Sequence, residues 1–369
     1  MCYGIKICGV IGMTGTYSNE MSPSKNTKNS SNFLRYIHNF RGFAILTIVA
    51  THIIAALQWR NETIEKITYI LIGNGTVYFV FIAGFLFQFL SSKYEYKKYL
   101  SKKLQYVILP YFFISIPAIQ LCLVEKIYTP PDWFQYHFSD WSLPGQILMY
   151  FLTGAHLPPF WFIPMITIFY IISPVLIWVD RHPKSYWILP ILLVITAIIP
   201  RAQYNANPIQ SFVHFLSVYM IGMFCSRYRD KIFVVLKKKY VWLLISFVIL
   251  TILEFTITPR PTAINSLSKL ILCVLIIYFL WLFELRLPKR FHELMSFLAE
   301  LSFGIYFLHG YFIIAYSGAA NKFEFNAFWT EANLLSFSLI FLFSVGASIV
   351  SLLIVKKSFG NKSRFIVGS

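Results

Sequence analysis

The chain has 369 residues, of which 57% are hydrophobic and only 13% are charged, whereas a soluble domain is about 25% charged. Together with a mean hydropathy of +0.63, these values exclude an ordinary soluble enzyme and predict a protein whose main partner is the lipid bilayer. The net charge is +17, but no zinc-finger, RNA-binding or basic-helix pattern accompanies it, so we expect no nucleic-acid partner.

The N-terminal segment, 1–32, has only short apolar patches and then a polar stretch, "SPSKNTKNSSN". It lacks the long apolar core of a signal peptide, so we expect a disordered cytoplasmic extension. A membrane domain is predicted at 33–355 and a short basic cytoplasmic tail at 356–369. The five cysteines have no paired metal-ligand spacing, so we expect packing roles for them and no metal site.

Apolar runs long enough to cross a bilayer as helices recur along the chain. A further run, at 143–154, is too short to span, which leaves an interfacial or a re-entrant position open. The predicted fold is all-α, with about ten transmembrane helices near 40–57, 67–90, 105–124, 160–179, 187–200, 209–226, 241–258, 267–285, 295–316 and 334–355.

The basic residues test this layout, because Lys and Arg accumulate in the loops that stay in the cytoplasm. Of the 32 basic residues, 25 lie in alternate segments that begin with the N-terminal one, and 7 lie in the intervening segments. This bias predicts that both termini are cytoplasmic. We therefore expect a multi-pass protein of the cell membrane.

The first predicted span carries Arg41 at its start and His52 inside it. At about 100° per residue, the spacing amounts to three turns and about 20°, so both side chains share one helix face, about 16 Å apart along the axis. A polar group in hydrocarbon is costly without a partner. The alternatives to a functional role are an interfacial anchor for Arg41 and a buried histidine bonded to another helix for His52.

Other spans carry titratable groups at a similar depth. His214, Glu254 and His309 fall in the outer halves of their predicted spans. Together with His52, they predict a polar cavity that opens to the extracytoplasmic side.

Aromatic and amide side chains within or near the spans are further candidates for substrate contacts. Trp161, at the outer end of the fourth span, is suited to stacking on a sugar ring, and packing is the alternative. Asn74 and Gln120 are candidates for hydrogen bonds only.

Five segments form one combined pattern. They are "FRGFAILTIVATH", with Arg41-x10-His52, then "VYFVFIAGFLF" at 77–87, "KKYLSKKLQYVILPYF" at 97–112, "FWFIPMITIFYIISPVL" at 160–176 and "LSFGIYFLHG" at 301–310. This combination resembles the membrane acyltransferase family 3, which moves acyl groups from a coenzyme A thioester to extracytoplasmic glycans. The resemblance covers about 33–355.

The sequence departs from the family pattern at several positions. Ala83 stands where many members have Ser, and Lys102 and Lys103 stand where arginines are common. The segment "DWSLPGQ" at 140–146 lacks the Glu that follows Trp-Ser-Leu in the branch that acetylates O-antigen. The closer resemblance is to the compact branch that includes exopolysaccharide and intercellular-adhesin modifying proteins.

The resemblance implies acyl-CoA as a donor substrate, no permanently bound cofactor, and a glycan hydroxyl as the acceptor, with acetyl or succinyl as the acyl group. A neutral histidine suits removal of the hydroxyl proton. We therefore expect His52 to be the base and Arg41 to fix the donor. His309 or Tyr306 is expected to orient His52 or the acceptor.

Cations on the cytoplasmic face are candidates for binding the phosphates of the donor. They are Arg35, Lys102, Lys103, Arg227 and Arg229. A solvated position under the positive-inside rule is the alternative for the lysines and for the last two arginines.

Two other classes of function fit a chain with many spans and intramembrane polar groups. One is a transporter that exports a polysaccharide, although no pair of corresponding broken helices is apparent in two halves. The other is an accessory subunit that assembles with polysaccharide synthesis or export proteins and needs no base.

Overall fold

The computed structural model describes residues 34–124, 141–202, 207–257, 262–322 and 331–369, so the predicted extension at 1–32 lies outside the described residues. Within these ranges the named elements of secondary structure are helices, which confirms the predicted all-α class. An isolated parallel β-bridge between Trp59 and Ala332 joins the segment after the helix Arg35–Ala56 to the segment before the helix Leu334–Phe359.

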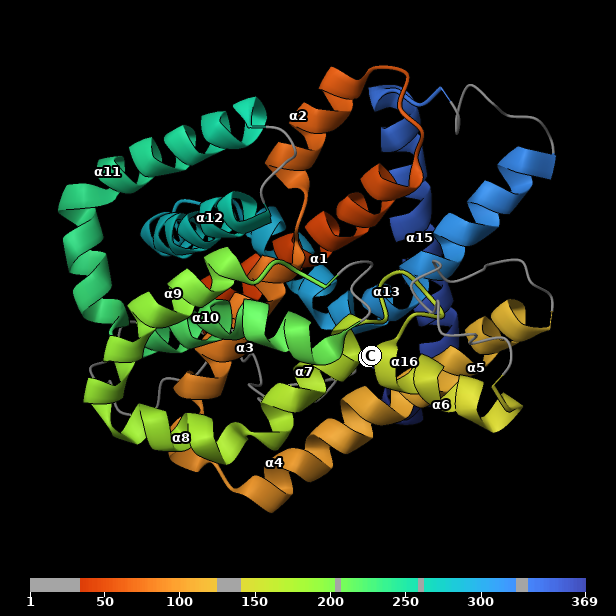
Figure 1. Ribbon diagram of the computed structural model, residues 1–369, viewed down its shortest axis with the longest axis horizontal. Coiled ribbons are helices and arrows are strands. Elements are labelled where there is room, and N and C mark those ends of the chain that lie inside the picture. The colour runs from red at the N-terminus through yellow and green to blue at the C-terminus, as the bar shows by residue number, and fades with distance from the viewer. Residues whose placement is uncertain (1–33, 125–140, 203–206, 258–261, 323–330) are drawn as a thin grey trace.

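The helices follow one another through short connections, and Figure 1 shows their arrangement. A π-helical turn, Leu104–Ile108, joins α4 to α5, and a 3-10 turn, Gly360–Lys362, joins α15 to α16. The helices are α1 (Arg35–Ala56), α2 (Glu62–Ile72), α3 (Thr76–Phe89), α4 (Tyr96–Lys103), α5 (Leu109–Leu123), α6 (Leu143–Thr153), α7 (Phe162–Ile171), α8 (Ser173–Arg181), α9 (Leu189–Ile198), α10 (Pro208–Arg227), α11 (Arg229–Thr256), α12 (Thr262–Leu282), α13 (Lys289–Lys322), α15 (Leu334–Phe359) and α16 (Ser363–Val367).

Seven segments of the described chain are long and apolar enough to cross a bilayer, and the bent pair α7 and α8 makes an eighth if it counts as one span. The seven lie in α1, α2–α3, α4–α5, α10, α12, α13 and α15–α16. The predicted spans at 187–200 and 241–258 fall on α9 and α11, which are not among them. Membrane-spanning helices are thus confirmed, whereas the count of ten and the cytoplasmic termini stay predictions.

The second predicted span is interrupted between α2 and α3, where Asn74 takes the left-handed conformation with a φ of 62°. The last carbonyl groups of α2 lose their helical partners there and need other donors inside the protein. The buried Lys269 of α12 supplies them, because its Nζ donates to the carbonyls of Ile70 and Leu71 at 2.5 and 2.9 Å. The two glycines that flank Asn74 favour this break over the predicted uninterrupted helix.

The fourth predicted span bends by 55° between α7 and α8. Pro174, at the start of α8, has no N–H to donate to the preceding turn. The Ser173 hydroxyl donates to the carbonyl of Tyr170 at 2.7 Å and contacts the Tyr94 hydroxyl at 2.8 Å, which fixes the bend.

Two helix pairs form the centre of the molecule, because α13 packs along α1 and α10 packs along α3. Each contact depends on a glycine. A Cβ atom at Gly42 would overlap the backbone of Met295, and one at Gly222 would overlap the carbonyl of Phe81. Small residues of this kind let membrane helices approach closely.

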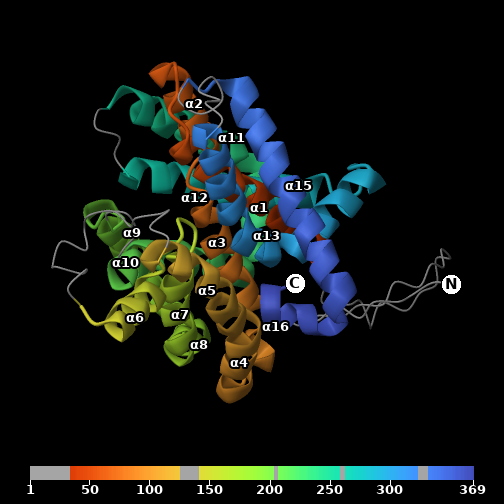
Figure 2. The same ribbon diagram turned by 90° about the vertical axis from the view of Figure 1, so that its right-hand side faces the viewer.

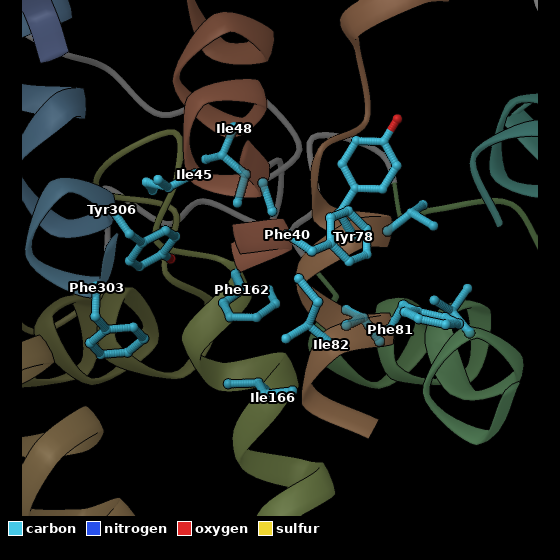
Figure 3. Close-up of a cluster of buried hydrophobic side chains, with 14 of the residues drawn as sticks. Phe40, Ile45, Ile48, Tyr78, Phe81, Ile82, Phe162, Ile166, Phe303 and Tyr306 are labelled. Carbon is cyan, nitrogen blue, oxygen red and sulfur yellow. The ribbon is translucent and has the colours of Figure 1, made fainter. Parts of the chain in front are cut away.

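Four helices meet in the core. Figure 3 shows Phe40 of α1, Tyr78 of α3, Phe162 of α7 and Phe303 of α13 in one cluster of buried side chains. In both overall views α2 lies at one end of the molecule, and α4 and α8 lie at the opposite end (Figure 2). The bias in basic residues predicts that the end with α4 faces the cytoplasm.

The predicted C-terminal tail, 356–369, is structured. It completes α15 and then forms α16, which packs against α5. Val367 is buried, and Gly368 lies against the ring of Phe303. This segment therefore supports the helix that carries His309.

We expect a cysteine placed at Lys238 to react only with a thiol reagent on the cytoplasmic side, and a cysteine at Glu62 only with one outside. Both positions are exposed and lie on opposite sides of the predicted layout. The experiment uses intact cells and a variant that lacks Cys2 and Cys8. The three cysteines that remain, Cys122, Cys225 and Cys273, are buried and should not react with the reagent. Labelling of both positions from one side would refute the orientation.

The substitution Gly222→Leu should separate α10 from α3 and lower the melting temperature of the detergent-solubilised protein. Overpacking of this kind typically costs about 1–3 kcal/mol. Gly346→Leu in α15 is the matched control, because apart from the backbone of its own helix no atom of the described residues lies within 4 Å of a Cβ at Gly346. Equal melting temperatures for the two variants would show that the α3–α10 contact does not require glycine.

Candidate functional site

The predicted polar face of α1 is turned toward α13. The Arg41 Nε atom donates to the hydroxyl of Ser302 at 2.8 Å, and the His52 ring lies against the His309 ring. Ser302 in turn donates to the carbonyl of Ala299 at 2.8 Å, so its hydroxyl is held as an acceptor for Arg41. The two predicted residues of α1 thus each meet a fully buried polar residue of α13.

The two histidines form a close pair, with ring centroids 5.2 Å apart and ring planes at 45°. His309 is fully buried, and its Nδ1 lies 2.9 Å from the carbonyl of Ile305, to which it donates. The neutral ring therefore keeps an acceptor at Nε2. That atom is buried and has no hydrogen-bond partner among the described residues, an arrangement that native structures retain mainly for a function or a bound molecule.

Tyr306 lies one turn before His309, and the two ring centroids are 6.2 Å apart. Its hydroxyl donates to the carbonyl of Pro159 at 2.5 Å. This bond ties α13 to the loop before α7. The structure thus places Tyr306 beside the histidine pair, with its hydroxyl already engaged.

A cavity of about 310 Å³ opens at the end of the molecule that carries α4, and we call it the basic cavity. Its wall includes apolar side chains of the core, among them Phe162 and Phe303. Its five cationic side chains are Arg41, Lys93, Lys98, Lys102 and Lys103.

Three of the predicted cations, Arg41, Lys102 and Lys103, therefore meet in one place. The Nζ atom of Lys103 lies 4.8 Å from the ring centroid of Tyr170 and 5.3 Å from that of Tyr99. Contacts with aromatic faces stabilise a partly buried cation. Lys103 is therefore held within the wall of the cavity, whereas Lys102 is exposed at its rim.

The other predicted cations do not line the basic cavity. Arg35 pairs with Glu284, with 3.7 Å between Nε and Oε1. Arg227 donates to Asp180 at 3.0 Å, and Arg229 lies 3.5 Å from a carboxylate oxygen of Asp230. Arg35 and Arg227 thus each pair with a residue distant in the sequence, whereas Arg229 and Asp230 are neighbours in α11.

A second cavity, of about 250 Å³, lies beside the break between α2 and α3, and we call it the polar cavity. Ile54 and Ala55 of α1, just past His52, form part of its wall. Its polar residues are Glu65, Tyr69, Asn74, Arg201, Glu254, Thr262 and Asn265. The predicted Glu254 and the weaker candidate Asn74 thus belong to one site.

His214 lies outside this wall. It is fully buried, with Nδ1 2.8 Å from the carbonyl of Ile199 and Nε2 3.0 Å from the hydroxyl of Ser266. Both ring nitrogens are satisfied. Of the four groups predicted at one depth, Glu254 lines the polar cavity, whereas His52, His214 and His309 line neither cavity, so the prediction of one shared cavity is wrong. His214 instead joins α10 to α12 and to the end of α9.

Trp161 is 4% exposed. The guanidinium carbon of Arg201 lies 5.0 Å from its ring centroid, and the ring of Phe215 stacks with it at 6.0 Å. These contacts leave little of the ring for a sugar and favour the packing alternative. Gln120 is exposed on α5 and lines neither cavity.

Four residues of the two sites were not predicted from the sequence: Ser302, Arg201, Asn265 and Lys269. Ser302 lies in the "LSFG" segment, and its spacing from His309 is a signal that could have identified it. In the sequence, Arg201 and Lys269 contributed only to the count of basic residues near the predicted outer ends of spans. Their roles depend on partners far away in the sequence.

The comparison with models of protein families agrees with this geometry. A family model described as an acyltransferase domain, that of acyltransferase family 3, matches residues 34–354. No curated protein and no solved structure shows a significant match. The family match runs from the residue before α1 into α15 and includes both helices of the histidine pair, so the chain belongs to acyltransferase family 3.

Proposed function

We propose that this protein is a membrane O-acyltransferase of the cell membrane that moves an acyl group, acetyl or succinyl, from cytoplasmic acyl-CoA to a hydroxyl of an extracytoplasmic polysaccharide or glycolipid. One observation carries the proposal. His52, which pairs with His309 of α13, shares a face of α1 with Arg41, and that arginine lines a cavity with four lysines.

The basic cavity suits the donor. Phosphate groups bind guanidinium and ammonium groups through charge-assisted hydrogen bonds, and an apolar wall suits an uncharged thioester arm. The predicted orientation puts this cavity on the cytoplasmic side, where acyl-CoA is available. Ser302 holds Arg41 through Nε. This bond restricts the rotation of the guanidinium and so determines where its two terminal nitrogens lie.

The histidine pair suits the transfer step. In the proposed reaction, His52 takes the proton of the acceptor hydroxyl while the oxygen attacks the thioester carbon. The C–O bond forms, the C–S bond breaks, and the proton passes from His52 to the leaving thiolate. The unpartnered Nε2 of His309 can accept a hydrogen bond from the protonated His52 and so stabilise it, which makes His309 a positioning residue.

A reconstituted system separates this function from the other classes. Liposomes that contain the purified protein would hold acyl-CoA with a labelled acetyl or succinyl group inside and a cell-surface polysaccharide fraction outside. An acyltransferase moves the label to the glycan. A polysaccharide exporter moves glycan across the membrane without the label, and a non-catalytic subunit does neither.

Arg41→Lys should raise the half-saturation concentration for acyl-CoA about tenfold or more, because hydrogen bonds to charged groups contribute about 1.5–3 kcal/mol. Lysine keeps the charge and the long stem but loses both the Nε–H group that donates to Ser302 and the planar fork of terminal nitrogens. Arg35→Lys is the matched control, since Arg35 lies outside the basic cavity. Equal half-saturation concentrations for the two variants at equal abundance would support a simple anchoring role.

His52→Gln should lower the rate of acyl transfer by about 10²- to 10⁴-fold, the usual loss when a positioned base is removed. Glutamine keeps hydrogen-bonding groups but takes no proton near neutral pH. The measurement is acylated glycan per unit of membrane-inserted protein. The control is His182→Gln, a change at an exposed histidine; comparable activity in both variants would return His52 to a structural role.

A further inference from the structure

Four polar side chains from different parts of the sequence form one chain of hydrogen bonds beside the polar cavity. Arg201 donates from Nη1 to Oδ1 of Asn74 at 3.1 Å, and Asn74 donates from Nδ2 to Oδ1 of Asn265 at 2.8 Å. Asn265 then donates from Nδ2 to Oε1 of Glu254 at 2.7 Å. We call this set of four residues the amide relay.

The amide relay joins a cation to a carboxylate without direct contact between them. In each of the three bonds, the donor belongs to the residue that is nearer to Arg201 along the relay. The two amide dipoles therefore point the same way. The oxygen end of each amide faces the cation, and the NH₂ end faces the carboxylate. Asn74, Asn265 and Glu254 are buried, and hydrogen bonds strengthen one another in such surroundings. Loss of either amide would interrupt the hydrogen-bonded path between the two charges.

The relay also fixes where Arg201 lies. One end of its guanidinium bonds to Asn74, and its face lies over the ring of Trp161, with the ring of Phe215 at 5.6 Å from the guanidinium carbon. Stacking on aromatic faces and a fixed fork restrict an arginine strongly. Arg201 is thus held in one position at the wall of the polar cavity, which it shares with Ile54, two residues after His52 in α1.

The polar cavity has the chemistry of a sugar site. Its wall offers two carboxylates, two amides and a guanidinium to hydroxyl groups, together with the apolar surfaces of Ile54 and Tyr69. A volume of about 250 Å³ is below the usual range of about 300–1,000 Å³ for drug-sized ligands, which suits one sugar ring. Because Glu254 balances Arg201 through the relay and Glu65 adds a further carboxylate, the described residues of the wall carry no excess of positive charge for an anionic sugar.

We propose that the polar cavity binds one uncharged sugar unit of the acceptor and that Arg201, positioned by the amide relay, orients this unit toward His52. This proposal rests on the proposed acyl transfer for the role of the sugar, but the binding itself does not require any reaction. The cavity and the reaction can therefore be tested separately.

The binding test uses a cysteine at Thr262, an exposed residue of the cavity wall, in the background without Cys2 and Cys8. Methyl glucoside should slow the reaction of this cysteine with a maleimide, whereas methyl glucuronide, which adds a carboxylate, should protect at least tenfold less well. A cysteine at Glu62, outside the cavity, should react at the same rate with and without either sugar.

The relay is tested by Asn74→Gly, because glycine accepts the left-handed conformation without strain but removes both hydrogen bonds of the relay, together with a longer one to Ser266 at 3.5 Å. We expect protection by methyl glucoside to fall about tenfold or more. In the transfer assay the KM for the acceptor should rise by a similar factor, while the KM for acyl-CoA stays unchanged. Asn61→Gly is the matched control, since Asn61 only caps α2 and this change costs a few tenths of a kcal/mol.

Arg201→Gln keeps a donor for Asn74 but removes the charge. This variant replaces Asn74→Gly in both assays if Asn74→Gly does not accumulate in the membrane. It too should weaken protection and raise the acceptor KM. Protection by the uronide as strong as by the glucoside, or no protection by either sugar, would overturn the proposal. Protection without any acyl transfer by the unmodified protein would instead contradict the proposed function and leave the sugar site standing.

Discussion

The close contact between α1 and α13 is the interaction on which the rest of the structure depends. Because Gly42 has no side chain, α1 approaches the backbone of α13, and the two helices pack along each other. This contact brings Arg41 to Ser302 and His52 to His309. Polar residues inside a membrane need partners or a cavity, and a single helix interface supplies them here for both predicted residues of α1.

Local features of the sequence predicted the part of the fold that local forces decide. Apolar length predicted helices, and the period of the helix predicted the shared face of Arg41 and His52, which the structure places against α13. The break between α2 and α3 has a local signal in the two glycines that flank Asn74, but its stabilising donor, Lys269, lies 199 residues from the carbonyl of Ile70. The bend at Ser173 likewise depends on Tyr94, which belongs to another segment.

The candidate site shows the same division. Counting along a span predicts the depth of a side chain but not the direction in which it faces, and direction depends on how the helices pack. His214 and Glu254 were therefore expected in one cavity, although His214 bonds to Ser266 and Ile199 while Glu254 lines the cavity wall. Trp161 was predicted to face a sugar, but it directly precedes α7 and Arg201 covers its ring.

The amide relay explains how a charged residue persists in this position. A direct pair of guanidinium and carboxylate would turn Arg201 toward Glu254 and away from the cavity. With Asn74 and Asn265 between them, the charge is balanced at a distance and the guanidinium stays at the cavity wall. The left-handed conformation of Asn74 sets the direction of its amide, so the break between α2 and α3 and the position of Arg201 are one structural feature.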